Sequence, residues 1–139
     1  GLGGETAGQE YPLASGSEHI LFVDDEPPIA RMGGRILENL GYKVTIRNSS
    51  LEALELFKEK KDTFDLVVTD MTMPSMTGDV LSMEIRRIRH DIPIIISTGY
   101  SNKMNDENAK RIGIDAFIYK PFTTADLAIT IRKTLDTIS

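Results

Sequence analysis

Short runs of aliphatic residues alternate along the chain with longer segments in which apolar residues recur every three or four positions. The most apolar runs are residues 20–23 (ILFV), 66–68 (LVV) and 94–96 (III). Continuous apolar runs of this length are typical of parallel strands that helices cover on both faces. We therefore expect these three runs to form the central strands of a parallel sheet.

Two further runs are less uniformly apolar and suit the edges of the same sheet. Residues 44–46 (VTI) stand between Lys43 and Arg47, and residues 116–119 (AFIY) are more aromatic. Both patterns fit strands that are less enclosed than the central ones. Five strands that alternate with helices predict a doubly wound α/β sheet with right-handed crossovers, and ligand chemistry at the carboxyl ends of the strands.

Five helical segments are expected from apolar residues at helical spacing. Ser49 and Glu52 read as a capping box, in which Ser49 accepts a hydrogen bond from the backbone. The segment 102–112 has few apolar residues, so a helix there buries little and should be marginally stable. The apolar stripes of the five segments lie within residues 29–40, 51–57, 81–88, 102–112 and 127–138.

The length and composition indicate one ordinary globular domain. The chain has 139 residues, which is the usual size of a single hydrophobic core. Residues 1–17 are rich in Gly, Ser and Glu and lack aliphatic periodicity, so we expect a linker or cloning-derived segment there and the folded domain over residues 18–139.

Composition also argues against several functional classes. Cysteine is absent, which excludes disulfides, thiolate zinc sites and thiol catalysis. No apolar run approaches the roughly 20 residues that span a bilayer. The net charge of −5 disfavours nucleic-acid binding, and Arg86, Arg87 and Arg89 read as a solvated helix face. Residence in the cytoplasm is the default expectation.

Acidic side chains come at the ends of two predicted central strands. Asp24 and Asp25 directly follow the first run, and Asp70 comes at the end of the second. A single Asp in such a place is more often a turn former or a helix cap. Three of them at one sheet edge repel one another, and a divalent cation with oxygen ligands relieves that repulsion. We expect Mg²⁺ there, with Mn²⁺ as an alternative.

A hydroxyl and an ammonium group are expected at the same edge. Thr98 comes at the end of the third central run, and Lys120 follows the last predicted strand. Alone, a strand-end Thr is usually structural and a lone Lys is usually solvated. Together with the carboxylates they provide a nucleophile, a donor and a fixed cation, which is a set suited to phosphoryl transfer.

Four motifs, in this order and spacing, resemble the receiver domains of two-component response regulators. They are LFVDDE, VVTDMTMPSMTG, IIISTG and FIYKPF, and the similarity extends over residues 18–137. The resemblance implies a flavodoxin-like fold with strand order 2-1-3-4-5. It also implies a phosphorelay function, in which a phosphohistidine donor transfers its phosphoryl group to Asp70 and a conformational switch follows.

The resemblance assigns a role to each residue at the predicted site. Asp25 is implied to bind Mg²⁺ directly and Asp24 largely through water, while Asp70 and the backbone carbonyl of Thr72 complete the protein ligands. Lys120 is implied to pair with the phosphoryl group. In most receivers the peptide bond between this lysine and the following proline is cis, so we expect a cis bond here.

Further residues are implied to govern the switch and the lifetime of the phosphorylated state. Thr98 matches the hydroxyl that moves toward the aspartyl phosphate, and Phe117 matches the aromatic residue whose rotamer follows it. Phe117 lacks the hydroxyl of the tyrosine often found there. Thr72 and Tyr100 occupy the two positions that tune hydrolysis of the acyl phosphate.

The expected partner is a histidine kinase or a histidine phosphotransfer domain, with phosphorylation-dependent dimerisation as a further possibility and no contact with nucleic acid or membrane. A linker-like segment before the domain and the end of the chain at Ser139 resemble the carboxyl-terminal receiver of a hybrid sensor histidine kinase. A stand-alone response regulator is the alternative parent. The domain is expected to catalyse its own phosphorylation and dephosphorylation without being a turnover enzyme.

Two other functional classes remain to be compared with the receiver. A metal-dependent phosphohydrolase also uses an aspartate nucleophile, but usually has a second Asp two residues further on, where this chain has Thr72. An interaction module with an inactive acceptor would not need the complete set of acidic, hydroxyl and ammonium groups. Both features favour the receiver.

Overall fold

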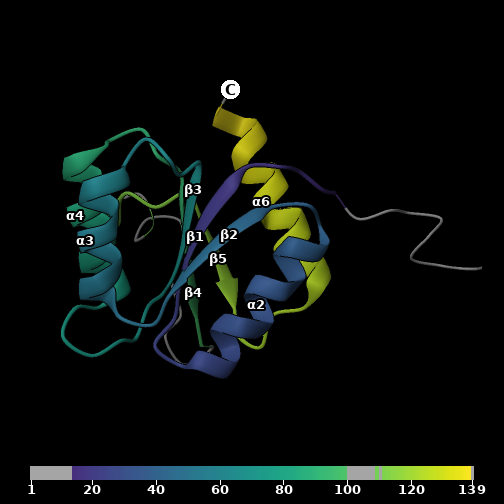
Figure 1. Ribbon diagram of the computed structural model, residues 1–139, viewed down its shortest axis with the longest axis horizontal. Coiled ribbons are helices and arrows are strands. Elements are labelled where there is room, and N and C mark those ends of the chain that lie inside the picture. The colour runs from purple at the N-terminus through teal and green to yellow at the C-terminus, as the bar shows by residue number, and fades with distance from the viewer. Residues whose placement is uncertain (1–13, 100–108, 110, 139) are drawn as a thin grey trace, which may run out of the picture.

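The structure is a computed structural model that describes residues 14–99, 109 and 111–138. Five strands form one parallel sheet in the order β2-β1-β3-β4-β5 (Figure 1). The strands are β1 His19–Val23, β2 Lys43–Arg47, β3 Leu66–Asp70, β4 Ile94–Thr98 and β5 Ala116–Tyr119. The predicted strand order is therefore confirmed, with the two less apolar runs at the sheet edges.

Four helices have bounds within the described residues: α2 Pro27–Asn39, α3 Ser50–Lys60, α4 Gly78–Ile88 and α6 Thr124–Ile138. In Figure 1, α2 and α6 cover one face of the sheet, and α3 and α4 cover the other. The predicted number of five helices is not reproduced in this part of the chain, because most of the segment 102–112 lies outside the described residues. Among the described helices, none has both the length and the apolar character needed to cross a membrane.

Local hydrogen bonds explain where two of the helices begin. The hydroxyl of Ser49 accepts a hydrogen bond from the backbone N–H of Glu52 (3.3 Å), as the capping box predicts for α3. At α6, the hydroxyl of Thr123 accepts from the N–H of Asp126 (3.0 Å), and the Asp126 carboxylate accepts from the N–H of Thr123 (2.9 Å). Thr123 is therefore the residue that caps α6.

Proline and glycine shape α2. Pro27 and Pro28 occupy its first turn, where backbone N–H groups have no partner within the helix. Gly41, just beyond the helix, has a φ of 101°, which is the left-handed conformation expected at a helix end. At Gly33 a side chain would overlap the ring of Phe22, so this glycine lets α2 lie close to β1.

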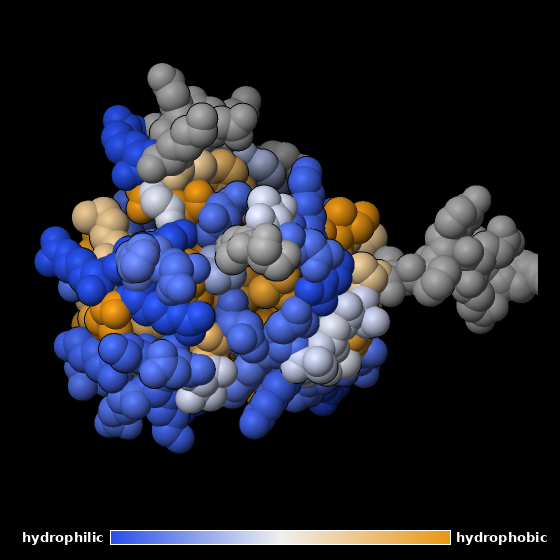
Figure 2. All heavy atoms as spheres, turned by 90° about the horizontal axis from the view of Figure 1, so that it is seen from above, coloured by the Kyte–Doolittle hydropathy of each residue, from blue (hydrophilic) through white to orange (hydrophobic). Residues whose placement is uncertain are grey.

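Apolar clusters on both faces of the sheet make it a rigid platform. One cluster includes Phe57 of α3 and Leu81 of α4, and the other includes Leu37 of α2 and Leu127 of α6; all four side chains are fully buried. The strands β3 and β4 are buried along their whole length. Figure 2 views the molecule from the end of Figure 1 at which α6 terminates, and there polar side chains cover most of the surface, with small separate apolar areas. The two apolar clusters thus hold the sheet between the helices, and polar side chains cover most of this end of the molecule.

Candidate functional site

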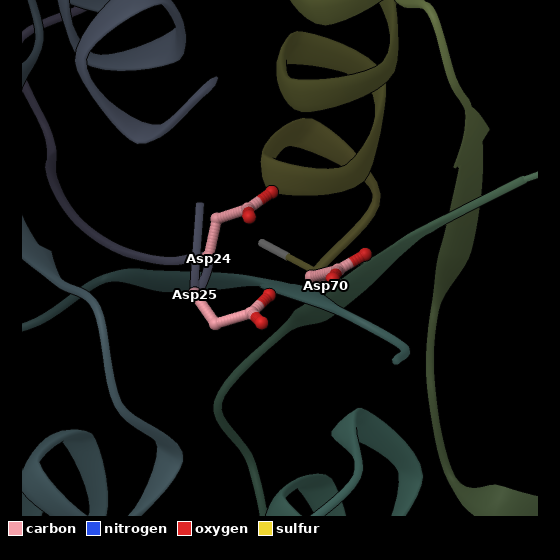
Figure 3. Close-up of side chains that lie close together, drawn as sticks. All are labelled: Asp24, Asp25 and Asp70. Atoms are coloured by element: carbon pink, nitrogen blue, oxygen red, sulfur yellow. The ribbon is translucent and has the colours of Figure 1, made fainter. Parts of the chain in front are cut away.

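Three carboxylates meet at the carboxyl ends of β1 and β3, and we call them the acidic cluster: Asp24, Asp25 and Asp70. One oxygen atom of each lies within 4.8 Å of the others. Figure 3 shows the carboxylates of Asp24 and Asp25 turned toward the side on which Asp70 lies. Asp24 is 1% exposed and Asp70 is 5% exposed, whereas Asp25 is half-buried. The structure thus brings together the acidic residues that the sequence placed at this edge.

The parallel register aligns the residues at this edge. Val23 of β1 pairs with Thr69 of β3, so the next residues on the two strands, Asp24 and Asp70, are neighbours. In the same way Asp70 pairs with Ser97 of β4. Asp24, Asp70 and Ser97 therefore lie side by side across the carboxyl ends of three adjacent strands.

Lys120 lies between two members of the acidic cluster. Its Nζ atom is 2.9 Å from Oδ2 of Asp24 and 3.0 Å from Oδ1 of Asp70. Its backbone N–H donates to the carbonyl of Thr98 (2.8 Å), so the pairing of β4 and β5 holds the residue in place. The peptide bond between Lys120 and the following proline is cis, as predicted. The ion pair with Asp24 was not anticipated from the sequence.

The charges at this edge are only partly balanced. Burial raises the pKa of Asp70; the hydrogen bond from Lys120 opposes this, and the charges of Asp24 and Asp25 raise it further. Burial lowers the pKa of Lys120, but its hydrogen bonds to Asp24 and Asp70 outweigh that effect, so its pKa is raised overall. One ammonium thus faces three carboxylates. This set of hard oxygen donors fits a divalent cation such as Mg²⁺.

The backbone of Asp24 is held by the loop that follows β2. Its N–H donates to the carbonyl of Arg47 (3.2 Å), and its carbonyl accepts from the side-chain amide of Asn48 (2.9 Å). The Oδ1 atom of Asp24 accepts from the N–H of Glu26 (2.9 Å). Asn48 was not predicted as a site residue, although its place directly after a parallel strand located it at this edge of the sheet.

The loop after β3 folds back onto the acidic cluster at Gly78. The N–H of Gly78 donates to the carbonyl of Met71 (2.7 Å), and a side chain at Gly78 would overlap the backbone carbonyl of Asp70. Thr72 lies exposed within this loop, and Ser75 has a φ of 69°. Gly78 was not singled out from the sequence, although it is the last residue of one quoted motif.

The other residues predicted to form the switch or to tune the phosphate lifetime lie on β4, on β5 and outside the described residues. Thr98 is the last residue of β4 and is buried; its hydroxyl is 3.5 Å from the carbonyl of Gly99. Phe117 pairs with Ile96 inside the sheet and packs, half-buried, against the core on the α3 and α4 side. Tyr100 lies outside the described residues.

The sequence is similar to a family of known proteins. A profile of the family described as the response regulator receiver domain matches residues 20–132. The sensor kinase CckA of Brucella abortus is 40% identical over 126 residues, which are 88% of this chain and 13% of that kinase. The response regulator SaeR of Staphylococcus aureus is 33% identical over 117 residues, which are 84% of this chain and 50% of that protein.

Solved structures share the fold. A response regulator receiver domain protein from Clostridium thermocellum superposes with a TM-score of 0.81 at 34% identity, covering 86% of this chain and 95% of that one. The receiver domain of the sensor histidine kinase PA1611 from Pseudomonas aeruginosa gives 0.76 at 25% identity, covering 87% and 99%. That structure holds a magnesium ion in its active-site cleft.

Proposed function

The chain belongs to the response regulator receiver domain family, and from this premise we propose that it accepts a phosphoryl group on Asp70 and reports the transfer through a change of conformation. The observation that carries the proposal is the position of Asp70, which is buried, paired with Lys120 at 3.0 Å and crowded by two further carboxylates. An isolated structural aspartate would not need this arrangement.

In the proposed transfer, Asp70 is the protein group that forms a covalent bond. A carboxylate oxygen of Asp70 attacks the phosphorus of a phosphohistidine; the new P–O bond forms as the P–N bond breaks, and the electron pair of the broken bond returns to the imidazole nitrogen. Lys120, whose Nζ is 3.0 Å from Asp70, would pair with the transferred group, and Thr98 would offer a hydroxyl from the end of the neighbouring strand β4. Positioning and charge neutralisation then supply most of the catalysis.

A divalent cation is part of the proposal. Asp25 and Asp70 would bind Mg²⁺, or Mn²⁺, directly, together with the backbone carbonyl of Thr72, while Asp24 acts largely through water. When bound, the ion supplies positive charge beside the phosphoryl oxygens. The carboxylate oxygens within 4.8 Å of one another support this site, as does the magnesium ion in the related Pseudomonas receiver.

The remaining site residues are proposed to report and time the signal. Thr98 and Phe117 form the proposed switch, because Thr98 ends β4 and Phe117 lies on the adjacent strand β5. Thr72 and Tyr100 are proposed to tune how fast the acyl phosphate hydrolyses. We also propose that phosphorylation can promote dimerisation of the domain.

The proposed donor is a histidine kinase or a histidine phosphotransfer domain. The match to 13% of a sensor kinase supports a receiver within a hybrid kinase, and the 95% coverage of a solved receiver chain supports the stand-alone alternative. We propose that residues 1–17 are a linker or cloning-derived segment and that residues 18–139 form the receiver domain. Residence in the cytoplasm stays a prediction.

Labelling with acetyl phosphate tests the acceptor without any kinase. The wild-type chain is expected to gain the mass of one phosphoryl group in the presence of Mg²⁺, and hydroxylamine is expected to remove it as it cleaves an acyl phosphate. Asp70→Asn keeps the shape of the side chain and should abolish the label. Asp62→Asn, at an exposed carboxylate after α3, is the matched control and should label normally.

Two results would contradict the proposal. A label that survives Asp70→Asn would mean that another residue is the acceptor. Rapid repeated turnover of p-nitrophenyl phosphate would favour the metal-dependent phosphohydrolase instead. We expect no such turnover, because Thr72 stands where that class usually has its second aspartate.

A further inference from the structure

The peptide that joins Asp24 to Asp25 is held from outside its own strand. It lies just beyond β1, where the hydrogen bond from Asp24 N–H to the carbonyl of Arg47 (3.2 Å) extends the pairing with β2. The carbonyl of Asp24 accepts its hydrogen bond from the side-chain amide of Asn48 (2.9 Å), which is 24 residues away in sequence. One side chain from the loop between β2 and α3 thus fixes the orientation of this peptide.

That orientation matters most for Asp25. A peptide unit is planar, so fixing the carbonyl of Asp24 also fixes the direction in which the backbone reaches Asp25. The Asp24 carboxylate has anchors of its own in Glu26 N–H and Lys120 Nζ, both at 2.9 Å. Within the described residues, the carboxylate of Asp25 has no comparable hydrogen bond or ion pair, so its position depends on the backbone.

Asn48 is also a close neighbour of Asp25 in space. Both residues line a surface hollow of about 250 Å³ between the start of α3 and the loop after β3. Asn48 itself is exposed, and water can replace its amide as the donor to the carbonyl of Asp24 if the side chain is removed. The hydrogen bond therefore contributes more to the direction of the peptide than to the stability of the fold.

We propose that Asn48 is a positioning residue for the acidic cluster, because its hydrogen bond to the carbonyl of Asp24 aims the carboxylate of Asp25 at the cation site. The inference rests on the proposed function, in which Asp25 binds Mg²⁺. Residues that orient metal ligands from outside the coordination sphere typically change metal affinity by about tenfold or more when they are removed. We expect about a tenfold loss of Mg²⁺ affinity when Asn48 loses its donor.

The test compares Asn48→Ala with a variant of the adjacent residue in the full 139-residue chain. Ser49→Ala removes the cap of α3, which binds the N–H of Glu52, and leaves the amide of Asn48 in place. Titration with Mg²⁺ should give a dissociation constant about tenfold higher for Asn48→Ala and unchanged for Ser49→Ala. Ser49→Ala should lower the thermal midpoint more than Asn48→Ala does, which separates positioning from stability.

A second readout needs no metal. In the metal-free protein, the NMR amide signals of Asp25 and Glu26 should be displaced in Asn48→Ala and remain in place in Ser49→Ala. Asn48→Leu, which keeps the branched shape of the asparagine side chain but has no donor, should behave as Asn48→Ala does. Agreement between these two variants identifies the donor, rather than the volume, as the cause.

Three outcomes separate the inference from the function on which it rests. Equal Mg²⁺ affinity in the wild type and in Asn48→Ala would overturn the positioning role. Unchanged amide signals of Asp25 and Glu26 in the metal-free variant would overturn it as well. A wild-type chain that binds no Mg²⁺ would overturn the proposed function instead, and the amide signals would then decide the role of Asn48 by themselves.

Discussion

The two ends of the parallel strands differ in how their charged side chains are arranged. We call the side on which the strands begin the amino edge and the side on which they end the carboxyl edge. At the amino edge, acidic and basic side chains form ion pairs: Arg132 Nη2 is 2.8 Å from Glu18 Oε2 and 2.9 Å from Asp136 Oδ1, and Arg86 Nη2 is 2.9 Å from Asp115 Oδ2. At the carboxyl edge, the ammonium of Lys120 pairs with Asp24 and Asp70, and the third member of the acidic cluster, Asp25, has no ion pair within the described residues. The same fold therefore places separate ion pairs at one edge and three crowded carboxylates with one ammonium at the other.

This difference separates stability from function. Matched pairs at a surface contribute at most about 1 kcal/mol each and mainly hold neighbouring segments together. Carboxylates that are crowded and buried lower the stability of the cation-free protein, and groups of this kind are typical of cation-binding and catalytic sites. The amino edge, which Figure 2 shows as mostly polar surface, thus serves the fold, while the carboxyl edge holds the proposed chemistry.

The largest single effect is expected at a glycine of the carboxyl edge, and a glycine of the amino edge serves for comparison. Gly78→Ala would push a side chain into the backbone carbonyl of Asp70 at the carboxyl edge, and we expect a loss of about 3 kcal/mol in the free energy of unfolding. Gly113→Ala, before β5 at the amino edge, meets no atom within 4 Å but has a φ of 87°. It should cost about 1 kcal/mol. Urea denaturation measures both, and equal losses would contradict the closer backbone packing at Gly78.

The second prediction is a difference of sign between two substitutions of aspartate. Asp70→Asn relieves crowding in the acidic cluster and should raise the free energy of unfolding in EDTA by about 1–2 kcal/mol. Asp115→Asn removes the charge that faces Arg86 and should lower it by about 1 kcal/mol. Denaturation in EDTA checks the signs. Destabilisation by both variants would mean that the acidic cluster is already neutralised without a cation.

The third prediction concerns the segment that precedes β1. Arg132 binds Glu18 and the backbone carbonyl of Ser15 (3.1 Å), so Arg132→Gln should cost about 1 kcal/mol and speed amide exchange at Gly16. Arg87→Gln is the matched control, because this side chain is 72% exposed and 3.7 Å from its acidic partner. Hydrogen exchange gives the readout. Equal exchange at Gly16 in both variants would show that Arg132 does not hold the segment.

The smallest effect is an opposite pH dependence at the two edges. A hydrogen bond from Arg132 lowers the pKa of Glu18 below its ordinary value of 4.5, so its stabilisation is present above that pH and is lost as the pH falls through the lowered pKa. Burial raises the pKa of Asp70 above 3.8, so stability is instead lost as the pH rises from that value through the raised pKa.

Denaturation over a pH series in EDTA can distinguish these two contributions. Glu18→Gln should reduce the loss of stability in acid, whereas Asp70→Asn should remove the loss that accompanies rising pH. Glu38→Gln, at an exposed carboxylate on α2, provides the background. If the slope of the free energy of unfolding against pH changed in the same direction in both variants, the contrast between the edges would be contradicted.

Much of the sheet and the location of the site could be predicted from the sequence. Continuous apolar runs identified β1, β3 and β4 as central strands, because only strands covered on both faces are apolar at successive positions. The residue after a parallel strand has to lie at the carboxyl edge, which placed Asp24 and Asp25 beside Asp70 and located Lys120 nearby. Strand periodicity and chain direction are local properties, so the sequence alone determined them.

The contacts between loops were decided only by the tertiary structure. Lys120 pairs with Asp24 across 96 residues of sequence, and Asn48 reaches the backbone of Asp24 across 24 residues. Gly78 is required where a loop folds back on Asp70. No local pattern encodes these contacts, because each forms only when packed strands and helices bring two separate loops within hydrogen-bonding distance, and small shifts in that packing decide which polar groups meet.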